Sequence, residues 1–266
     1  MAIRYSFPSL IISTWFFVAL FAGSLPLQPD AIMLNKILLA PEFHAWLGYD
    51  DLGRSIAQRL ILGARTSFLV AMCVVSISFI IGTTIGVMAA WFGGWWDKAT
   101  VLVIDIFIAF PGILLAIALS GLMGPGIMNA VLALSVVGWV GFARLARAQT
   151  LTVKHREHVT AAQALGTDTA SIAIHHILPL IMAPLVIEAT FAIAGTVIAE
   201  AGLSFLGLGV QAPDPSWGSM IRDGARFMLV APHMVLAPGM AILLVVLSIN
   251  LLGDSLRDKM DLRSKA

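Results

Sequence analysis

Long apolar runs with few or no charges are the feature that most limits what this chain can fold into. We find six of them, at residues 9–28, 67–90, 99–121, 126–143, 177–199 and 235–252. About 20 consecutive apolar residues form a helix long enough to cross the hydrocarbon of a bilayer. None of the runs has the alternation of a ten-residue barrel strand. The sequence therefore predicts an all-α polytopic membrane protein with six transmembrane helices.

The composition supports a membrane protein. The chain has 266 residues, of which 59% are hydrophobic and 12% charged, whereas soluble domains carry about a quarter charged residues. The formal net charge of +1 gives no electrostatic footprint for nucleic acid, so we expect no nucleic-acid partner. The single cysteine, Cys73, excludes an intrachain disulfide. No internal repeat or soluble-domain boundary is visible, so we expect one transmembrane domain over residues 1–266.

Basic residues indicate the orientation, since they accumulate in cytoplasmic loops. With the termini inside, the inner segments hold Arg4, Lys98, Arg144, Arg147, Lys154, Arg156, Arg257, Lys259, Arg263 and Lys265. The outer segments, at 29–66 and 200–234, hold Lys36, Arg54, Arg59, Arg65, Arg222 and Arg226. Ten basic residues in the inner segments against six in the outer segments favour cytoplasmic termini. The first run also resembles a signal peptide, but it lacks a small-residue cleavage site, so we expect an uncleaved helix.

The segment between spans four and five, residues 144–176, carries the most information. Glu157–Leu165 is rich in alanine, begins with an acid and contains no breaker, which predicts a helix. Gly166 ends it, and Thr167 or Asp168 caps a second helix that runs into span five. Val159, Ala162 and Leu165 are expected on one face. Spacing alone leaves two readings open: a connector lying on the membrane surface, or a dock for another protein.

This segment resembles the conserved cytoplasmic loop of ABC importer permeases, with pattern Glu-Ala-Ala, three residues, Gly, nine residues, Ile, one residue, Leu-Pro. The pattern falls on Thr160, Ala161, Ala162, Gly166, His176, Leu178 and Pro179. Thr160 replaces the glutamate and His176 the isoleucine. The wider block from Glu157 looks like the peptide and nickel branch of these importers.

Three further segments extend the resemblance to that branch. They are His44–Arg54, which contains Gly-Tyr-Asp-Asp-Leu-Gly-Arg; Glu200–Gly218, which ends in Asp-Pro-Ser-Trp-Gly; and Asn250–Asp258. All of them occur in the family's order and topology. The resemblance implies the architecture of a type I ABC importer permease, in a bacterial inner membrane.

The same resemblance implies partners and a mechanism. A second, homologous permease would complete the translocation pathway, two cytoplasmic ATPases would bind ATP and magnesium, and an extracytoplasmic binding protein would deliver substrate. No cofactor is expected on this chain. The loop would be a coupling helix seated on an ATPase, with the contacts made by Glu157, Thr160, Ala161, Ala162, Leu165, Gly166, His176, Leu178 and Pro179. Di- or oligopeptides would be the cargo, with nickel or another metal chelate as the alternative.

Three acidic residues in or near the spans need an explanation, because charges are costly there. Asp105 lies about 10 Å beyond Lys98 along span three, where a structural hydrogen bond or ion pair is favoured over a functional role. Glu188 and Glu200 lie about 18 Å apart along span five. They either line a pathway for a cationic group or form structural bonds.

The sequence does not contain the motifs of an ATPase or of the common hydrolases. It lacks a P-loop, His-Glu-x-x-His and Gly-x-Ser-x-Gly, and we find no set of converging catalytic residues or metal ligands. We therefore expect no catalytic residue and no metal site, and a membrane enzyme is disfavoured. An ion-driven secondary transporter is a more distant alternative, because the two halves show no matching interrupted helices.

Overall fold

The computed structural model describes the backbone of residues 3–43 and 45–263, and this part of the chain is helical without any strand. Its helices are α1 (Ile3–Phe21), α2 (Ile56–Phe92), α3 (Gly94–Ala109), α4 (Gly112–Met123), α5 (Ile127–Val153), α6 (Glu157–Ala164), α7 (Thr169–Ser171), α8 (Leu178–Phe205), α9 (Trp217–Ala225) and α10 (His233–Arg263). A π-helix, Ile172–Ile177, joins α7 to α8.

Five helical segments are long and apolar enough to cross a membrane, and a sixth span exists if the bent pair α3 and α4 counts as one. The five include α1, α2, α5 and α10, and the segment Thr169–Phe205 that contains α8. The prediction of an all-α membrane protein is therefore confirmed.

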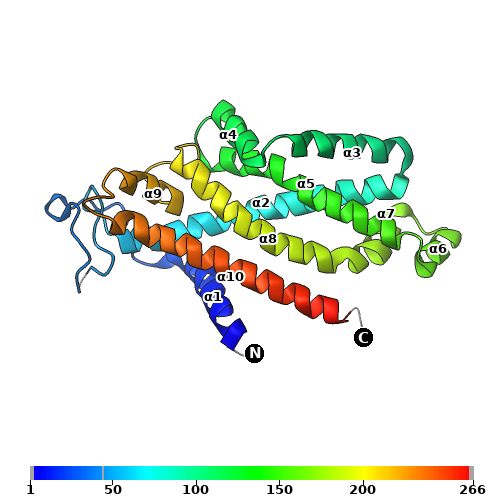
Figure 1. The fold of residues 1–266 in the computed structure, drawn as a ribbon, viewed down its shortest axis with the longest axis horizontal. Coiled ribbons are helices and arrows are strands. Elements are labelled where there is room, and N and C mark those ends of the chain that lie inside the picture. The colour runs from blue at the N-terminus through cyan, green and yellow to red at the C-terminus, as the bar shows by residue number, and fades with distance from the viewer. Residues whose placement is uncertain (1–2, 44, 264–266) are drawn as a thin grey trace.

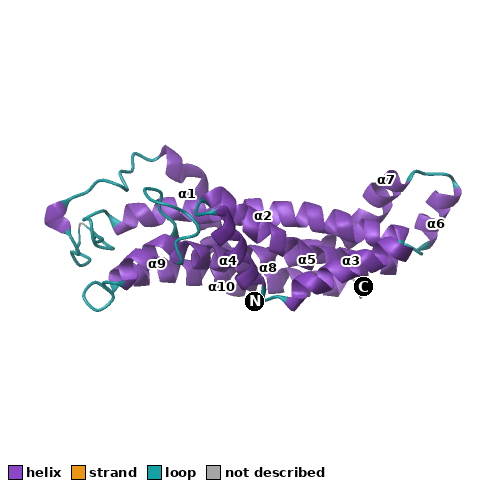
Figure 2. Cartoon of the chain, turned by 90° about the horizontal axis from the view of Figure 1, so that it is seen from above, coloured by secondary structure: helices purple, strands orange, loops and turns teal. Residues whose placement is uncertain are grey.

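The molecule is elongated, with α2, α5, α8 and α10 running along its length (Figure 1). The coil between α1 and α2 lies together with α9 at one end of the molecule, and α6 and α7 form the opposite end (Figure 2). The buried core lies along α2, which packs on α5 over most of its length and also on α8. The two expected connecting regions therefore lie at opposite ends of the bundle.

Gly82 and Gly86 allow α2 and α5 to approach closely. A Cβ on Gly82 would collide with the carbonyl oxygen of Trp139, and one on Gly86 with that of Ala143. The four-residue spacing places both glycines on one helix face, where the absence of side chains lets two backbones meet. The sequence pattern thus corresponds to a real helix crossing.

The third span differs from the single helix expected at 99–121. It is broken into α3 and α4, which meet at 87°. Phe110 is extended, with φ −100° and ψ 137°, because the ring of Pro111 disfavours a helical conformation in the residue before it. Pro111 also lacks the N–H that would continue the helix. The proline therefore breaks the span.

Several helices also end at different residues from the apolar runs. The first ends at Phe21, well before residue 28, while α2 begins at Ile56 and α5 continues to Val153. The loop expected from residue 144 therefore begins only at Lys154. Apolar runs place helix ends wrongly where charged residues occur, because charged residues stay helical when they form ion pairs or hydrogen bonds. Arg59, for example, is buried in α2 and donates to Asp30 at 3.0 Å.

Candidate functional site

The tip at one end of the molecule is built from α6 and the segment that leads into α8 (Figure 1). Val159 and Ala162 are buried and pack with Ile172 and Ile177 of the π-helix. Glu157, Thr160 and Ala161 point outward and are exposed. The helix is therefore fixed to the bundle by one face and presents the other face to the surroundings.

Leu165 does not share the buried face, and that expectation was wrong. Its side chain is 86% exposed, because α6 ends at Ala164 and the chain turns away at Gly166, whose φ is +78°. A left-handed residue of this kind ends many helices, and glycine adopts it without steric cost. The turn therefore leaves a large apolar side chain mostly exposed at the tip.

The helix after the turn begins as expected. The Asp168 carboxylate accepts a hydrogen bond from the Ser171 backbone N–H at 2.9 Å and so caps α7. The chain then stays helical through the π-helix into α8, where Pro179 lies in the first turn. His176 is half-buried, with its ring centroid 6.3 Å from that of His158. The tip is thus continuous with span five.

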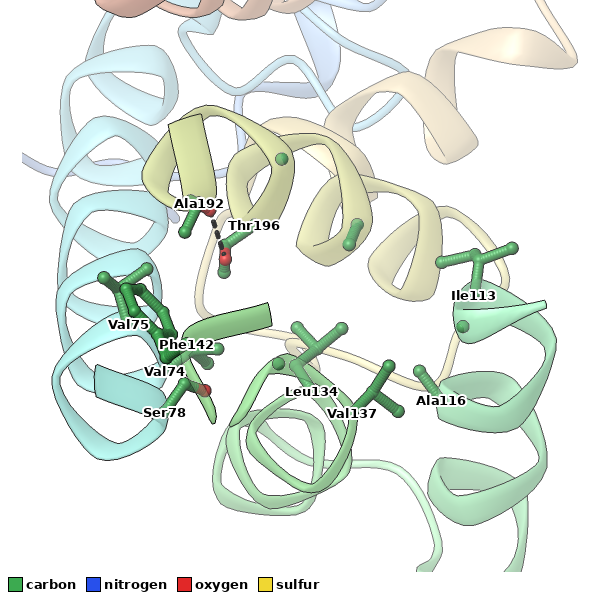
Figure 3. Close-up of a pocket in the computed structure, with 14 residues that line it drawn as sticks. Val74, Val75, Ser78, Ile113, Ala116, Leu134, Val137, Phe142, Ala192 and Thr196 are labelled. Carbon is green, nitrogen blue, oxygen red and sulfur yellow. Dashed lines mark hydrogen bonds between the residues drawn. The ribbon is translucent and has the colours of Figure 1, made fainter. Parts of the chain in front are cut away.

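A cavity of about 250 Å³ lies among α2, α4, α5 and α8 (Figure 3). Its wall is mostly apolar, and its α8 side consists of small residues. The lining residues are Val74, Val75, Ser78, Gly112, Ile113, Ala116, Leu134, Val137, Gly138, Phe142, Ala192, Gly195, Thr196 and Ala199. We did not predict this cavity, although the small residues at three- and four-residue spacing on α8 were a usable signal.

Glu188 lies next to this cavity. It is four residues before Ala192 on α8, so both occupy one face of the helix. Its Oε1 lies 3.0 Å from where a Cβ of Gly141 would stand, and Gly141 is three residues after the lining residue Gly138. The side chain is half-buried, and the described residues offer it no hydrogen bond or ion pair. A carboxyl group without an internal partner therefore lies one helical turn from the cavity lining.

The other two acids differ in their surroundings. Asp105 lies on the exposed side of α3 beside the buried Ile104, and no described residue provides the internal bond that we favoured. Glu200, by contrast, is only 1% exposed. Its carboxylate accepts hydrogen bonds from Ser67 on α2 at 3.0 Å and from Ser204 at 2.7 Å. Glu200 thus has structural bonds within the bundle, whereas the described residues offer none to Glu188.

The sequence signature that ends at Arg54 folds as a tight turn. The Asp50 carboxylate accepts from the backbone N–H groups of Leu52 and Arg54 at 3.0 and 2.8 Å, and from the Arg54 guanidinium at 2.7 Å. Gly53 has a φ of +72°, and a Cβ there would collide with the Met33 backbone. Asp, Gly and Arg are therefore needed for the turn itself. His44, which begins the signature, lies outside the described residues.

The sequence signature that ends at Gly218 leads into α9. Ser216 and Ser219 cap the helix reciprocally, and Trp217 is buried with its Nε1–H donating to the Leu60 carbonyl of α2 at 3.1 Å. A Cβ on Gly218 would collide with the Ala201 backbone. These residues hold α9 against α2 and α8. Among the described residues no three His, Cys, Asp or Glu side chains are grouped to hold a metal.

Comparison with known proteins agrees with this architecture. Residues 82–265 match the family described as the binding-protein-dependent transport system inner membrane component. The dipeptide transport system permease protein DppC of Alkalihalophilus pseudofirmus is 40% identical over 97% of this chain and 85% of its own length. The glutathione transport system permease protein GsiD of Pectobacterium atrosepticum is 41% identical over 87% of this chain and 77% of its own length.

The fold is similar to that of a solved importer. Superposition on a chain of the MetNI methionine ABC transporter in an inward-facing conformation gives a TM-score of 0.61 over 76% of this chain and 97% of that chain, at 19% identity. Sequence and fold agree, and the chain belongs to the family of binding-protein-dependent transport system inner membrane components, the permeases of ABC importers.

Proposed function

We propose that this chain is one of two related permease subunits of an ATP-driven importer for di- or oligopeptides. Its relatives above 40% identity include a glutathione permease, and the dipeptide permease matches almost the whole chain. Both of those names specify small peptides, so a peptide is the substrate class that the comparisons favour. This chain would form the pathway, while ATP and magnesium would bind to two separate ATPase subunits.

In this proposal the α6 end faces the cytoplasm, as do both termini. The excess of basic residues in the segments near that end supports this orientation. The opposite end, formed by α9 and the coil between α1 and α2, would then receive the substrate from an extracytoplasmic binding protein. The partner permease would lie alongside the bundle.

The observation that carries the proposal is the exposed tip of α6. Leu165 is 86% exposed, and Glu157, Thr160 and Ala161 of the same tip are exposed too, so the tip offers a surface that no described residue covers. We assign the ATPase to this surface, with Glu157, Thr160, Ala161 and Leu165 in contact and Val159 and Ala162 as the anchor. Movement of the ATPase would pass through the continuous helix from Thr169 to Phe205.

Co-purification tests this assignment. The detergent-solubilised complex would be isolated through a tag on this chain, and the amount of bound ATPase measured. Leu165→Glu adds a charge to the tip without removing any internal packing, so we expect it to release the ATPase. Leu229→Glu is the matched control, since Leu229 is 100% exposed in the turn after α9 at the opposite end of the molecule.

The two variants separate docking from folding. If Leu165→Glu loses ATPase while Leu229→Glu keeps it, the α6 end is the dock. If both variants retain the wild-type amount of ATPase, the assigned surface is wrong.

Uptake of a radiolabelled dipeptide by cells that carry the complete wild-type transporter tests the substrate class, and no uptake by an assembled complex would contradict the peptide proposal.

A further inference from the structure

The cavity among α2, α4, α5 and α8 has the properties of a binding pocket. Its volume of about 250 Å³ is far above the ~10–15 Å³ that holds one water and just below the range of small-molecule pockets. Its wall is apolar except for two hydroxyl groups, which belong to Ser78 and Thr196 (Figure 3). Apolar walls with a few fixed polar groups are typical of sites that bind organic ligands.

Ser78 is the polar group that most needs a partner. Its side chain is 1% exposed, and its Oγ has no hydrogen-bond partner among the described residues. An unpaired buried hydroxyl is costly, because nothing replaces the water that it loses. Thr196 differs, since its hydroxyl donates to the Ala192 carbonyl at 2.7 Å and can still accept a bond. The Thr196 hydroxyl therefore retains a free lone pair, whereas the Ser78 Oγ is enclosed by the protein.

Glu188 places a carboxyl group one helical turn from the cavity lining. It shares one face of α8 with Ala192, Thr196 and Ala199, and lies about 6 Å along the helix axis from Ala192. Its carboxylate has no internal partner among the described residues. A cationic group at this position would be paired, while an attached apolar group would reach the cavity.

We infer that this cavity and Glu188 form a subsite for the N-terminal residue of a peptide in transit. The peptide ammonium pairs with the Glu188 carboxylate, and the first side chain occupies the apolar cavity. The N-terminal residue of a peptide carries an ammonium group and a side chain within this span. The inference rests on the proposed peptide importer and adds where the permease contacts its cargo.

Gly195 provides the means to fill the pocket without disturbing the helix. It lines the cavity on α8, and a Cβ at this position would have no neighbour within 4 Å. Gly202 on the same helix has equally open surroundings but does not line the cavity. Gly195→Val and Gly202→Val are therefore a matched pair, which differ only in whether the added methyl groups enter the pocket.

The first test measures uptake of alanyl-alanine and leucyl-alanine by cells that carry the complete transporter. All variants share one binding protein, so a change in the ratio of the two uptake rates originates in the permease. We expect Gly195→Val to reduce leucyl-alanine uptake relative to alanyl-alanine by about tenfold, as loss of a fitting pocket does. Gly202→Val should leave the ratio unchanged, and Glu188→Gln should lower uptake of both peptides.

The outcomes distinguish the subsite from the proposed function. If the wild-type complex imports both peptides and Gly195→Val keeps the wild-type ratio, the subsite is wrong and the importer proposal stands. If the assembled wild-type complex imports neither peptide, the proposed function fails and the subsite fails with it. Equal amounts of purified complex for Gly195→Val and wild type exclude misassembly as the cause of a lower rate.

A second test separates a water-filled site from a cleft filled by lipid. Gly195→Cys in a Cys73→Ser background would be treated with a charged methanethiosulfonate reagent, which reacts from water. We expect labelling of the complex, and slower labelling when leucyl-alanine and the binding protein are present. Labelling only by an uncharged, membrane-soluble maleimide would identify a lipid cleft and would overturn the inference.

Discussion

Arg147 on α5 holds Asp97 on α3 through two parallel hydrogen bonds, from Nε to Oδ1 at 2.5 Å and from an Nη to Oδ2 at 2.7 Å. Asp97 follows the turn at Gly93 and Gly94, both of which have positive φ angles. Ile104 is the one described residue of α3 that is fully buried. The start of α3 is therefore positioned mainly by this ion pair, and apolar packing contributes little.

We predict that Asp97→Asn and Arg147→Lys each lower the stability of the chain by about 1 kcal/mol, because each removes the paired geometry of a partly exposed bridge. Thermal unfolding of the purified complex measures the loss, and a double-mutant cycle isolates the pair. The effects of the two substitutions should be strongly non-additive.

Lys98→Gln is the control for this prediction. Lys98 is exposed on the same turn of α3, and the described residues form no ion pair with it. Its removal changes the local charge but not the bridge, so we expect unchanged stability. A similar loss for all three variants would show that charge near the turn, and not the bond between Arg147 and Asp97, positions α3.

The buried carboxylate of Glu200 leads to a second prediction. Glu200→Ala leaves the hydroxyls of Ser67 and Ser204 without their acceptor, so we expect a loss of about 2–3 kcal/mol in stability. Glu200→Gln keeps a side-chain oxygen and should lose less. Peptide uptake by Glu200→Gln should stay near wild type once the amount of complex is matched. A stable Glu200→Ala complex without transport would contradict the structural role.

Much of the fold follows from the sequence, since apolar runs and helix-ending residues act locally. The six runs predict the spans, Glu157 and Gly166 bound α6, and Asp168 caps α7 as expected. These features depend on neighbours within a few positions, which a sequence displays directly. The glycine pair at 82 and 86 likewise predicts a close helix crossing.

The remainder depends on contacts between distant residues. Glu188 and Glu200 have similar surroundings in the sequence. A hydrogen bond from Ser67, which lies 133 positions before Glu200, gives Glu200 a structural role. The cavity forms where four helices meet, so no single segment of the sequence predicts it. Leu165 also matched the helical periodicity of Val159 and Ala162, and only the turn at Gly166 takes it off the buried face.

Gly86 provides a third prediction, on helix packing. Gly86→Val would place methyl groups against the Ala143 carbonyl oxygen and the backbone of Arg147, so α2 and α5 must separate. Overpacking of this kind costs about 1–3 kcal/mol, which a lower unfolding temperature of the purified complex would report. Gly121→Val on α4 is the control, because a Cβ at Gly121 has no neighbour within 4 Å. Equal unfolding temperatures for the two variants would refute a tight crossing.

Asp51 provides a prediction on pH. Burial, reinforced by the neighbouring Asp50 and opposed by Arg54, raises the pKa of the Asp51 carboxyl above its ordinary value of 3.8. A raised pKa favours the protonated carboxyl in the folded chain. The protonated carboxyl therefore stabilises the fold fully at pH values below its pKa in the unfolded chain, and this stabilisation is lost as the pH rises through its pKa in the folded chain. Asp51→Asn should therefore raise the unfolding temperature at about pH 7, with the gain shrinking toward about pH 4. Asp50→Asn should lower it instead, since Asp50 accepts bonds from Leu52 and Arg54. A lower unfolding temperature of Asp51→Asn at neutral pH would show that the attraction between Asp51 and Arg54 outweighs the cost of burying the Asp51 charge.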